Sequence, residues 1–305
     1  MIRPLTRLAG GHTVVSMSTA VEGADSLRPE QANFAKAKTP VINPDTSTYQ
    51  TLLDEKAARV RELFGDRLQV PLHVQASKPI NYRMRAEFRV WKMGEECHFA
   101  MFDPQTKKPI FIEQYPLACE RINEIMRDLQ EVFKRDRAIR HKIFQVEFVA
   151  STSGEALVCL VYKRKLDDEW LEAAQRLSAK LGERGQTCHV VGRSKGKKHV
   201  VGEDHVVQWQ EVAGKAYPQW QTENRFSQSN AQICNAMQTW VLDQLRGPEG
   251  RRASDILELY CGNGNFSLPL ASIFRKVLAT ELDKFSVRAA VACAGEIQVR
   301  EVWVI

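Results

Sequence analysis

The chain has 305 residues and a formal net charge of +6, from 43 Lys and Arg against 37 Asp and Glu. Hydrophobic residues make up 44% and charged residues 26%, a composition that indicates a folded globular protein and excludes a disordered one. The small basic surplus permits a polyanionic partner without requiring one. No apolar run approaches the roughly 20 residues that a membrane helix needs, so no membrane partner is predicted.

Seven cysteines are scattered along the chain, and no two of them lie two or three residues apart. This spacing excludes zinc ribbons and iron–sulfur centres, so we expect no metal cluster. An odd number of thiols within apolar stretches predicts reduced, buried cysteines and an intracellular protein.

The first 47 residues lack the periodicity of a folded domain. Arg3 and Arg7 precede the first acidic residue, Glu22, and the segment up to position 47 is polar with several prolines. Two interpretations stay open, a disordered extension or an organelle transit peptide. The first is compatible with a cytoplasmic protein, and the second with a mitochondrial or plastid one.

The region 48–225 is predicted to be an α+β domain, because strands and helices are mixed without a regular βαβ alternation. Helical periodicity marks 48–64, 119–135 and 168–181. Strands are predicted at 83–90, 97–103, 143–150, 156–163 and 187–192, followed by a basic loop at 193–199. Strict alternation in 83–90 places one set of side chains inward: Met84, Ala86, Phe88 and Val90. The other face carries Arg83, Arg85, Glu87 and Arg89.

In the region 226–305 predicted strands and helices alternate, which predicts the first part of a doubly wound α/β domain. A helix near 233–245 is followed by a strand at 255–260, a glycine turn, a short helix and a strand at 276–281. Residues 302–305 could begin a third strand. We therefore expect a partial Rossmann-like domain.

The run ILELYCGNGNF at 256–266 is the strongest functional signal in the sequence. Gly262 and Gly264 allow a tight turn and a close approach of a ligand to the backbone. Glu281 ends the next predicted strand, where a carboxylate can accept hydrogen bonds from ribose hydroxyls. Phe266 replaces the third glycine of a dinucleotide fingerprint, which favours S-adenosylmethionine as the cofactor. The alternative is a glycine-rich turn that binds no cofactor.

Five segments resemble the RNA uracil-5-methyltransferase family, and specifically its tRNA branch. They are LELYCGNGNFSL at 257–268, NYRMRAEFR at 81–89, HKIFQ at 141–145, KLDDEW at 165–170 and FSQSN at 226–230. The resemblance implies an S-adenosylmethionine-dependent enzyme that forms 5-methyluridine in the tRNA T-arm, and we expect a monomer. It places Gln228, Tyr260, Asn265 and Glu281, beside Gly262 of the turn, at the cofactor. It places Phe144 and the arginines Arg83, Arg85 and Arg89 at the tRNA.

Each RNA-facing residue also has a simpler interpretation. Phe144 could be an ordinary core residue of its strand, and the arginines could form a solvated face paired with Glu87. Lys195, Lys197 and Lys198 fit a solvated loop better than a phosphate contact.

The family's reaction requires a cysteine thiolate that adds to carbon 6 of uracil and a base that removes the carbon 5 proton. The Asp-Pro-Pro-Arg and Ser-Cys-Asn-Pro segments that accompany this chemistry in the family do not occur in these 305 residues. Cys261 and Cys293 are better explained as buried thiols. We therefore expect no catalytic residue in this chain, a truncated catalytic domain and no methyl transfer by the chain alone. The alternatives are a non-catalytic tRNA-binding protein and a small-molecule methyltransferase.

Overall fold

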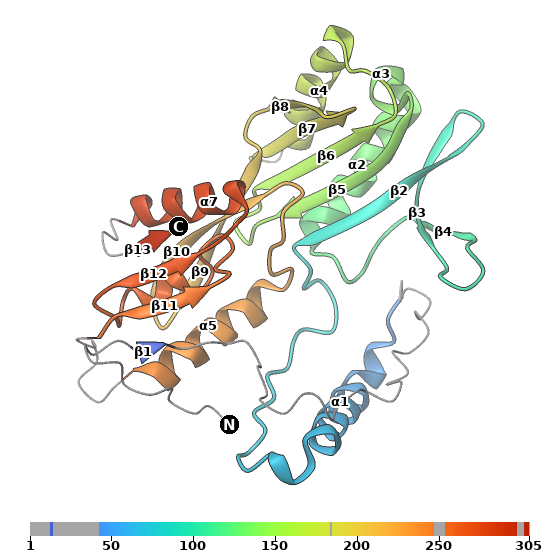
Figure 1. Ribbon diagram of the computed structural model, residues 1–305. Coiled ribbons are helices and arrows are strands. Elements are labelled where there is room, and N and C mark those ends of the chain that lie inside the picture. Colours follow the sequence, from blue (N-terminus) through green and yellow to red (C-terminus); the bar gives the residue numbers. More distant parts are fainter. Residues whose placement is uncertain (1–12, 15–42, 184, 247–253, 298–301, 305) are drawn as a thin grey trace.

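A computed structural model describes residues 13–14, 43–183, 185–246, 254–297 and 302–304. The chain forms a seven-stranded sheet backed by helices, a long hairpin and a second, parallel sheet (Figure 1). Of the predicted N-terminal extension, most residues lie outside the described part of the chain. No helix in the described part is both long and apolar enough to cross a lipid bilayer.

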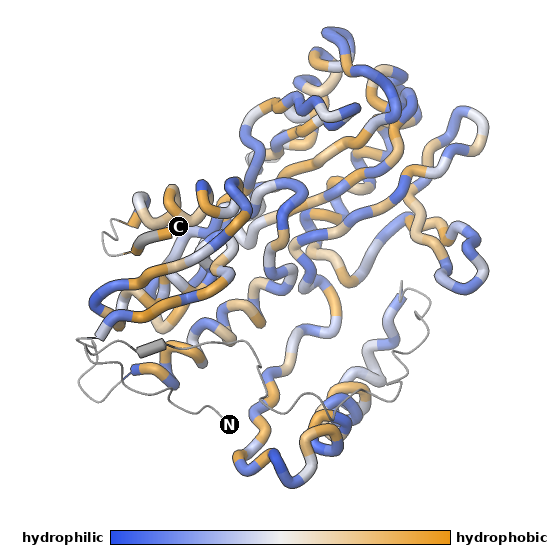
Figure 2. The backbone as a smooth tube through the Cα atoms, viewed as in Figure 1, coloured by the Kyte–Doolittle hydropathy of each residue, from blue (hydrophilic) through white to orange (hydrophobic). Residues whose placement is uncertain are grey.

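The large sheet has the strand order β4-β3-β2-β5-β6-β7-β8, and its neighbours are antiparallel except for the parallel pair β6 and β7. Its strands are β2 (Arg85–Met93), β3 (Glu96–Phe102), β4 (Pro109–Ile112), β5 (Ile143–Ala150), β6 (Ala156–Tyr162), β7 (Cys188–Ser194) and β8 (Lys197–Val201). Along β2 the predicted alternation is confirmed, since Ala86, Phe88 and Val90 are buried. The central strands are mostly hydrophobic (Figure 2).

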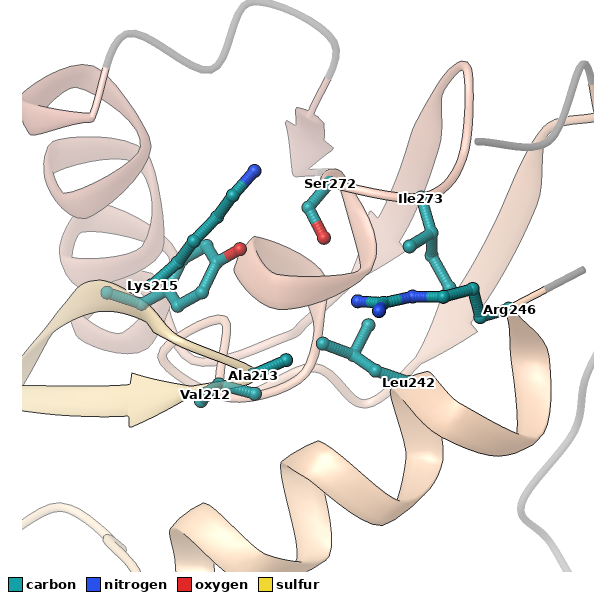
Figure 3. A pocket seen from close by; sticks show the side chains of 8 residues that line it. Val212, Ala213, Lys215, Leu242, Arg246, Ser272 and Ile273 are labelled. Carbon is teal, nitrogen blue, oxygen red and sulfur yellow. The ribbon is translucent and has the colours of Figure 1, made fainter. Parts of the chain in front are cut away.

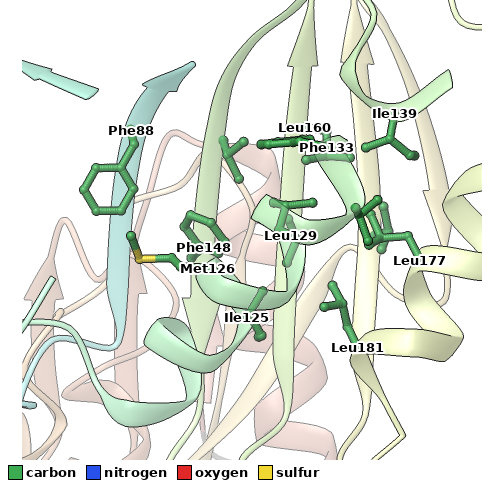
Figure 4. Packing of buried hydrophobic residues seen from close by; sticks show 14 of the residues in the cluster. Phe88, Ile125, Met126, Leu129, Phe133, Ile139, Phe148, Leu160, Leu177 and Leu181 are labelled. Atoms are coloured by element: carbon green, nitrogen blue, oxygen red, sulfur yellow. The ribbon is translucent and has the colours of Figure 1, made fainter. Parts of the chain in front are cut away.

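Two long helices cover one face of this sheet, α2 (Glu120–Arg135) and α4 (Asp168–Leu181), with the short α3 (Arg137–Arg140) beside them. The apolar stripe of α2 packs against β5 and β3, and that of α4 packs against β7 (Figure 4). Asp167 begins α4 by accepting a hydrogen bond from the backbone N–H of Trp170 at 3.0 Å. The helix α4 supplies the crossover that a parallel strand pair requires.

The helix α1 (Tyr49–Phe64) lies outside this core, between the short 3-10 turns η2 (Thr46–Thr48) and η3 (Gly65–Arg67). Ala57 is its one buried residue. The Tyr49 hydroxyl donates to the Ser77 carbonyl at 2.6 Å and accepts from the Ser77 N–H at 2.8 Å. This pair of hydrogen bonds ties the start of α1 to the segment that leads into β2.

The hairpin of β9 (His205–Val212) and β10 (Lys215–Thr222) joins the two halves of the molecule. Its turn places Ala213 and Gly214 at positive φ, as a two-residue hairpin turn requires. Val206 packs against the large sheet, whereas Val212 and Tyr217 belong to the core of the second sheet. The hairpin thus shares the C-terminal core although it precedes the predicted domain boundary at 225, and that boundary stays a prediction.

The second sheet is parallel, with the order β1-β11-β12-β13. Its strands are β1 (Thr13–Val14), β11 (Ile256–Leu259), β12 (Val277–Thr280) and β13 (Val302–Val304), and its helices are α5 (Ala231–Leu245), α6 (Ser267–Leu270) and α7 (Lys284–Glu296). Strand, turn, helix and parallel strand follow one another as predicted for a Rossmann-like domain. The predicted third strand is confirmed at β13.

The sequence prediction was wrong in the basic segment 193–199. Most of it forms the ends of β7 and β8, and only Lys195 and Gly196 make the turn between them. Both turn residues have positive φ, which lets a two-residue hairpin close. The hairpin of β9 and β10, strand β4 and helix α7 were not predicted.

Candidate cofactor turn and RNA-facing sheet

The glycine turn after β11 is held in a conformation that glycine permits and most other residues resist. Tyr260, Gly262 and Gly264 all have positive φ, at 59°, 58° and 81°. A Cβ on Gly264 would lie 3.2 Å from the Ala290 Cβ of α7, so this glycine lets the helix pack closely. A Cβ on Gly262 would meet nothing within 4 Å. The backbone at Gly262 is therefore open to a ligand.

The Glu281 carboxylate fixes this turn against the end of the neighbouring strand. One oxygen accepts a hydrogen bond from the Gly262 N–H at 2.9 Å. The other oxygen accepts from the N–H groups of Leu282 and Asp283, both at 2.8 Å. A carboxylate has about four lone-pair sites, so Glu281 keeps capacity for a ribose hydroxyl. The structure thus brings together Gly262 and Glu281, as the sequence predicted.

Asn265 has a structural role that the sequence did not predict. Its side-chain oxygen accepts hydrogen bonds from Gln219 Nε2 at 2.8 Å and from Gln238 Nε2 at 3.1 Å. The Cys234 thiol donates to the same oxygen at 3.2 Å. These bonds tie the turn to β10 and α5, so the oxygen of Asn265 faces the protein interior. Its predicted contact with the cofactor stays a prediction that can involve only the remaining amide group.

Gln219 and Gln238 are the residues of this site that sequence reasoning missed. Gln238 lies one helical turn after Cys234 on the buried stripe of α5, and it is fully buried. A glutamine within an apolar stripe was the available signal, because a buried amide requires hydrogen-bond partners. Gln219 gave no such signal, since β10 itself was not predicted.

Tyr260 and Gln228 are placed differently from each other. Tyr260 is 85% exposed at the turn, next to the open backbone of Gly262. Gln228 is half-buried in the segment between β10 and α5. That segment is tied to the large sheet, because the Met84 N–H donates to the Ser229 carbonyl at 2.7 Å. Both predicted cofactor contacts stay predictions.

All seven cysteines are free and buried. Burial raises the pKa of Cys261 and that of Cys293 to about 12. The Cys293 sulfur also accepts a hydrogen bond from the backbone N–H of Trp220 at 3.3 Å. Thiols with such pKa values carry almost no thiolate at neutral pH, which does not favour either as a nucleophile. The interpretation of both as buried thiols is confirmed.

Glu258 on β11 predicts a pH-dependent stability. Burial raises the pKa of Glu258 to about 7 from its usual 4.5, against a hydrogen bond from the Ser267 hydroxyl that lowers it. The folded state therefore binds a proton more tightly than the unfolded chain does. The stabilisation of the fold by the protonated Glu258 side chain is complete below pH 4.5 and is lost as the pH rises through about 7.

We expect Glu258→Gln, which mimics the protonated acid, to gain stability relative to the natural protein as the pH rises from 5 to 8. The difference in unfolding free energy should grow by roughly 1–3 kcal/mol. Urea unfolding of both proteins at the two pH values measures it. A difference that is equal at both pH values would show that Glu258 titrates normally.

The RNA-facing prediction separates into a cluster around Phe144, formed by Arg89, Phe144 and Lys163, and a half-buried arginine, Arg85. The Arg89 guanidinium lies 3.9 Å from the centre of the Phe144 ring, and the Lys163 ammonium lies 4.2 Å from it. The register between β5 and β6 shifts at Phe144, which is half-buried rather than part of the core. The structure thus brings together Arg89 and Phe144, and it adds Lys163, which the sequence did not suggest.

Arg85 is held by contacts inside the protein. Its guanidinium donates to the Arg225 carbonyl and to the Ser227 hydroxyl, the latter at 3.3 Å. Burial lowers the pKa of Arg85, although Glu147 lies 4.0 Å away. Arg83 is half-buried, and its Nε donates to the Arg85 carbonyl at 3.4 Å. The predicted arginine face is therefore not uniform, because Arg89 alone of the three is exposed.

A buried group of Glu147, Cys159 and Glu223 has ligand atoms within 4.8 Å of one another, close enough to hold a metal ion. Protein cations already neutralise it. Arg193 and Lys198 each lie 3.5 Å from Glu223. Because a metal would have to displace these pairs, the group fits an ion-pair network better than a metal site. Lys198, predicted as a loop residue, is part of this network.

The parallel sheet, the glycine turn and the acid that ends the next strand define the class, a Rossmann-like fold of the methyltransferase type. The family described as tRNA (uracil-5-)-methyltransferase matches residues 48–305, and the chain belongs to this family.

Two curated relatives, each called tRNA/tmRNA (uracil-C(5))-methyltransferase, are 43% identical to the chain. That of Pseudomonas fluorescens aligns over 83% of this chain and 68% of its own length, and that of Vibrio cholerae over 82% and 66%. The chain thus spans about two thirds of the length of the curated relatives that it matches.

A solved structure has the same fold. The tRNA (uracil-54, C5)-methyltransferase of Pyrococcus abyssi, in complex with S-adenosyl-L-homocysteine, superposes with a TM-score of 0.63. The match covers 84% of this chain and 62% of that protein at 16% sequence identity. At this level of identity the likeness supports the fold alone.

Proposed function

We propose that this chain holds the tRNA-binding domain and the S-adenosylmethionine-binding turn of a tRNA uracil-5-methyltransferase, acting as a monomer on a uridine of the T-arm. We assign 48–225 to the tRNA-binding domain and 226–305 to the methyltransferase domain. The observation that carries the proposal is the Glu281 carboxylate bonded to the Gly262 N–H, in a chain that matches this family over 48–305.

The residues of the turn fit the proposed cofactor. The open backbone at Gly262 can approach the methionine part, and Glu281 can accept a hydrogen bond from a ribose hydroxyl. Exposed Tyr260 offers a ring beside the same turn. When bound, S-adenosylmethionine supplies an electrophilic methyl group on a sulfonium.

The Phe144 cluster fits an RNA loop. An aromatic ring can stack on a base and replace the stacking that a flipped uridine loses. Arg89 and Lys163, both next to that ring, can pair with the neighbouring phosphates. The ring and its two cations therefore supply stacking and charge at one place.

Phe144→Ala should weaken tRNA binding by roughly tenfold, because one base stack on an aromatic ring is worth about 1–3 kcal/mol. Filter binding at fixed salt measures the effect. Phe64→Ala, which removes an exposed ring at the end of α1, outside the large sheet, is the matched control. Equal affinities of the two variants would remove Phe144 from the RNA contact.

The function is tested by mixing the purified chain with tRNA and S-adenosylmethionine labelled in its methyl group. We expect both ligands to bind and no label to enter the tRNA, because none of the seven cysteines is an exposed thiol. Transfer at the rate of a full-length relative would contradict the expected inactivity. If the chain binds tRNA but does not bind S-adenosylmethionine, the result would instead favour a non-catalytic tRNA-binding protein.

A further inference from the structure

A hollow of about 190 Å³ lies between the turn of the β9–β10 hairpin, the end of α5 and the segment after α6 (Figure 3). The glycine turn lies elsewhere and contributes no residue to it. Its floor is apolar, formed by the fully buried side chains of Val212, Leu242 and Ile273. Ala213 and Ser272 complete the lining together with three larger polar residues, Lys215, Tyr217 and Arg246.

Within the described part of the chain, the side-chain donors of Lys215, Tyr217 and Arg246 form no hydrogen bond. Tyr217 is only 5% exposed, lines the hollow, and its hydroxyl has no hydrogen-bond partner among the described residues. The hydroxyl oxygen itself is not enclosed in the interior, so it can donate to a ligand or to water in the hollow. Ser272 does not count among these donors, because its hydroxyl donates to the Pro269 carbonyl at 2.7 Å.

The charge of the hollow is positive. Lys215 and Arg246 pair with no carboxylate in the described part of the chain, and no acidic residue lines the hollow there. Arg246 points across it toward Ser272 (Figure 3). The carbonyl end of α5 adds a partial negative charge, which two full positive charges outweigh.

We propose that this hollow binds a phosphate group attached to a small apolar body. A phosphate has enough acceptor oxygens for a guanidinium fork, an ammonium and a phenol at once. The apolar floor lies beside these donors, and the volume exceeds that of several water molecules at about 30 Å³ each. The phosphate comes from a free phosphate monoester or from the backbone of an RNA.

Calorimetric titration of the purified chain with phenyl phosphate, inorganic phosphate and benzoate tests the proposal. We expect phenyl phosphate to bind more tightly than either of the others, since it alone satisfies both the donors and the floor. Arg246→Gln should weaken phenyl phosphate binding by roughly tenfold, and Tyr217→Phe should weaken it too. Lys276→Gln, an exposed lysine outside the hollow, is the matched control and should leave binding unchanged.

The same variants separate the two sources of phosphate. Loss of tRNA affinity in Arg246→Gln, at a factor matching the loss for phenyl phosphate, assigns the phosphate to RNA. Unchanged tRNA affinity with lost phenyl phosphate binding assigns it to a free monoester. The proposal is overturned if the natural chain binds no phenyl phosphate, if benzoate binds equally well, or if Arg246→Gln and Lys276→Gln bind alike.

Discussion

Replacing Glu281 by alanine should reduce the affinity for S-adenosyl-L-homocysteine by at least about tenfold. The carboxylate accepts N–H groups from Gly262, Leu282 and Asp283, and it is the group that we assign to the ribose. A hydrogen bond to a charged group is worth about 1.5–3 kcal/mol, so losing the one to a ribose hydroxyl already gives this factor. Calorimetric titration measures the change directly.

Two further variants make the Glu281 result interpretable. Glu281→Gln keeps the shape but removes the charge, and we expect an intermediate loss of affinity. Glu211→Ala removes an exposed carboxylate of β9 and should bind as the natural chain does. Urea unfolding of all three shows whether the fold survives. Binding by Glu281→Ala within about threefold of the natural chain would exclude the assigned role.

Gly192→Ala should destabilise the large sheet by about 3 kcal/mol, the upper end of the usual cost of overpacking a core. A Cβ at this position of β7 would lie 2.2 Å from Cη2 of Trp170 and 2.7 Å from a methyl carbon of Leu166. Trp170 is fully buried and packs edge-on to Tyr162 at 5.9 Å between ring centres. The indole cannot move away without disturbing this packing.

Gly295→Ala is the matched control for Gly192→Ala. Gly295 lies in helix α7, where an added Cβ meets nothing within 4 Å. Alanine favours a helix over glycine, so this variant should be neutral or more stable by up to about 1 kcal/mol. Equal unfolding free energies of the two variants would show that Trp170 can be repacked at little cost.

The local elements were predictable where hydrophobic periodicity is strong. Helices α1, α2, α4 and α5 and strands β2, β5, β6, β11 and β12 all lie where the spacing of apolar residues predicts them. The Gly262–Glu281 pairing was predictable as well, because parallel neighbouring strands end at the same edge of the sheet.

The hairpin of β9 and β10 was not predictable, because polar residues occupy its buried positions. Gln208 and Gln210 are both buried in β9, between Val206 and Val212. The alternation of apolar and polar residues that marks a strand is therefore lost. Gln208 is satisfied by Thr152, which lies 56 residues away in sequence. Such pairing depends on tertiary contacts that a local pattern does not contain.

The contacts of the arginines in β2 were likewise not predictable from the local sequence pattern. Alternation correctly placed Arg85 and Arg89 on one face of the strand. It could not show that the segment before α5 folds over Arg85 and leaves Arg89 open beside Phe144. Which polar residue binds a partner and which supports the fold is decided by elements distant in sequence.

Hydrogen–deuterium exchange with and without S-adenosyl-L-homocysteine tests the cofactor turn most directly. The ligand should slow exchange in peptides that cover 256–266 and 281–283, where the Gly262, Leu282 and Asp283 N–H groups surround Glu281. Peptides from α2 and α4, on the large sheet, should exchange at unchanged rates. Unchanged exchange in both turn peptides at saturating ligand would contradict the assignment of this turn to the cofactor.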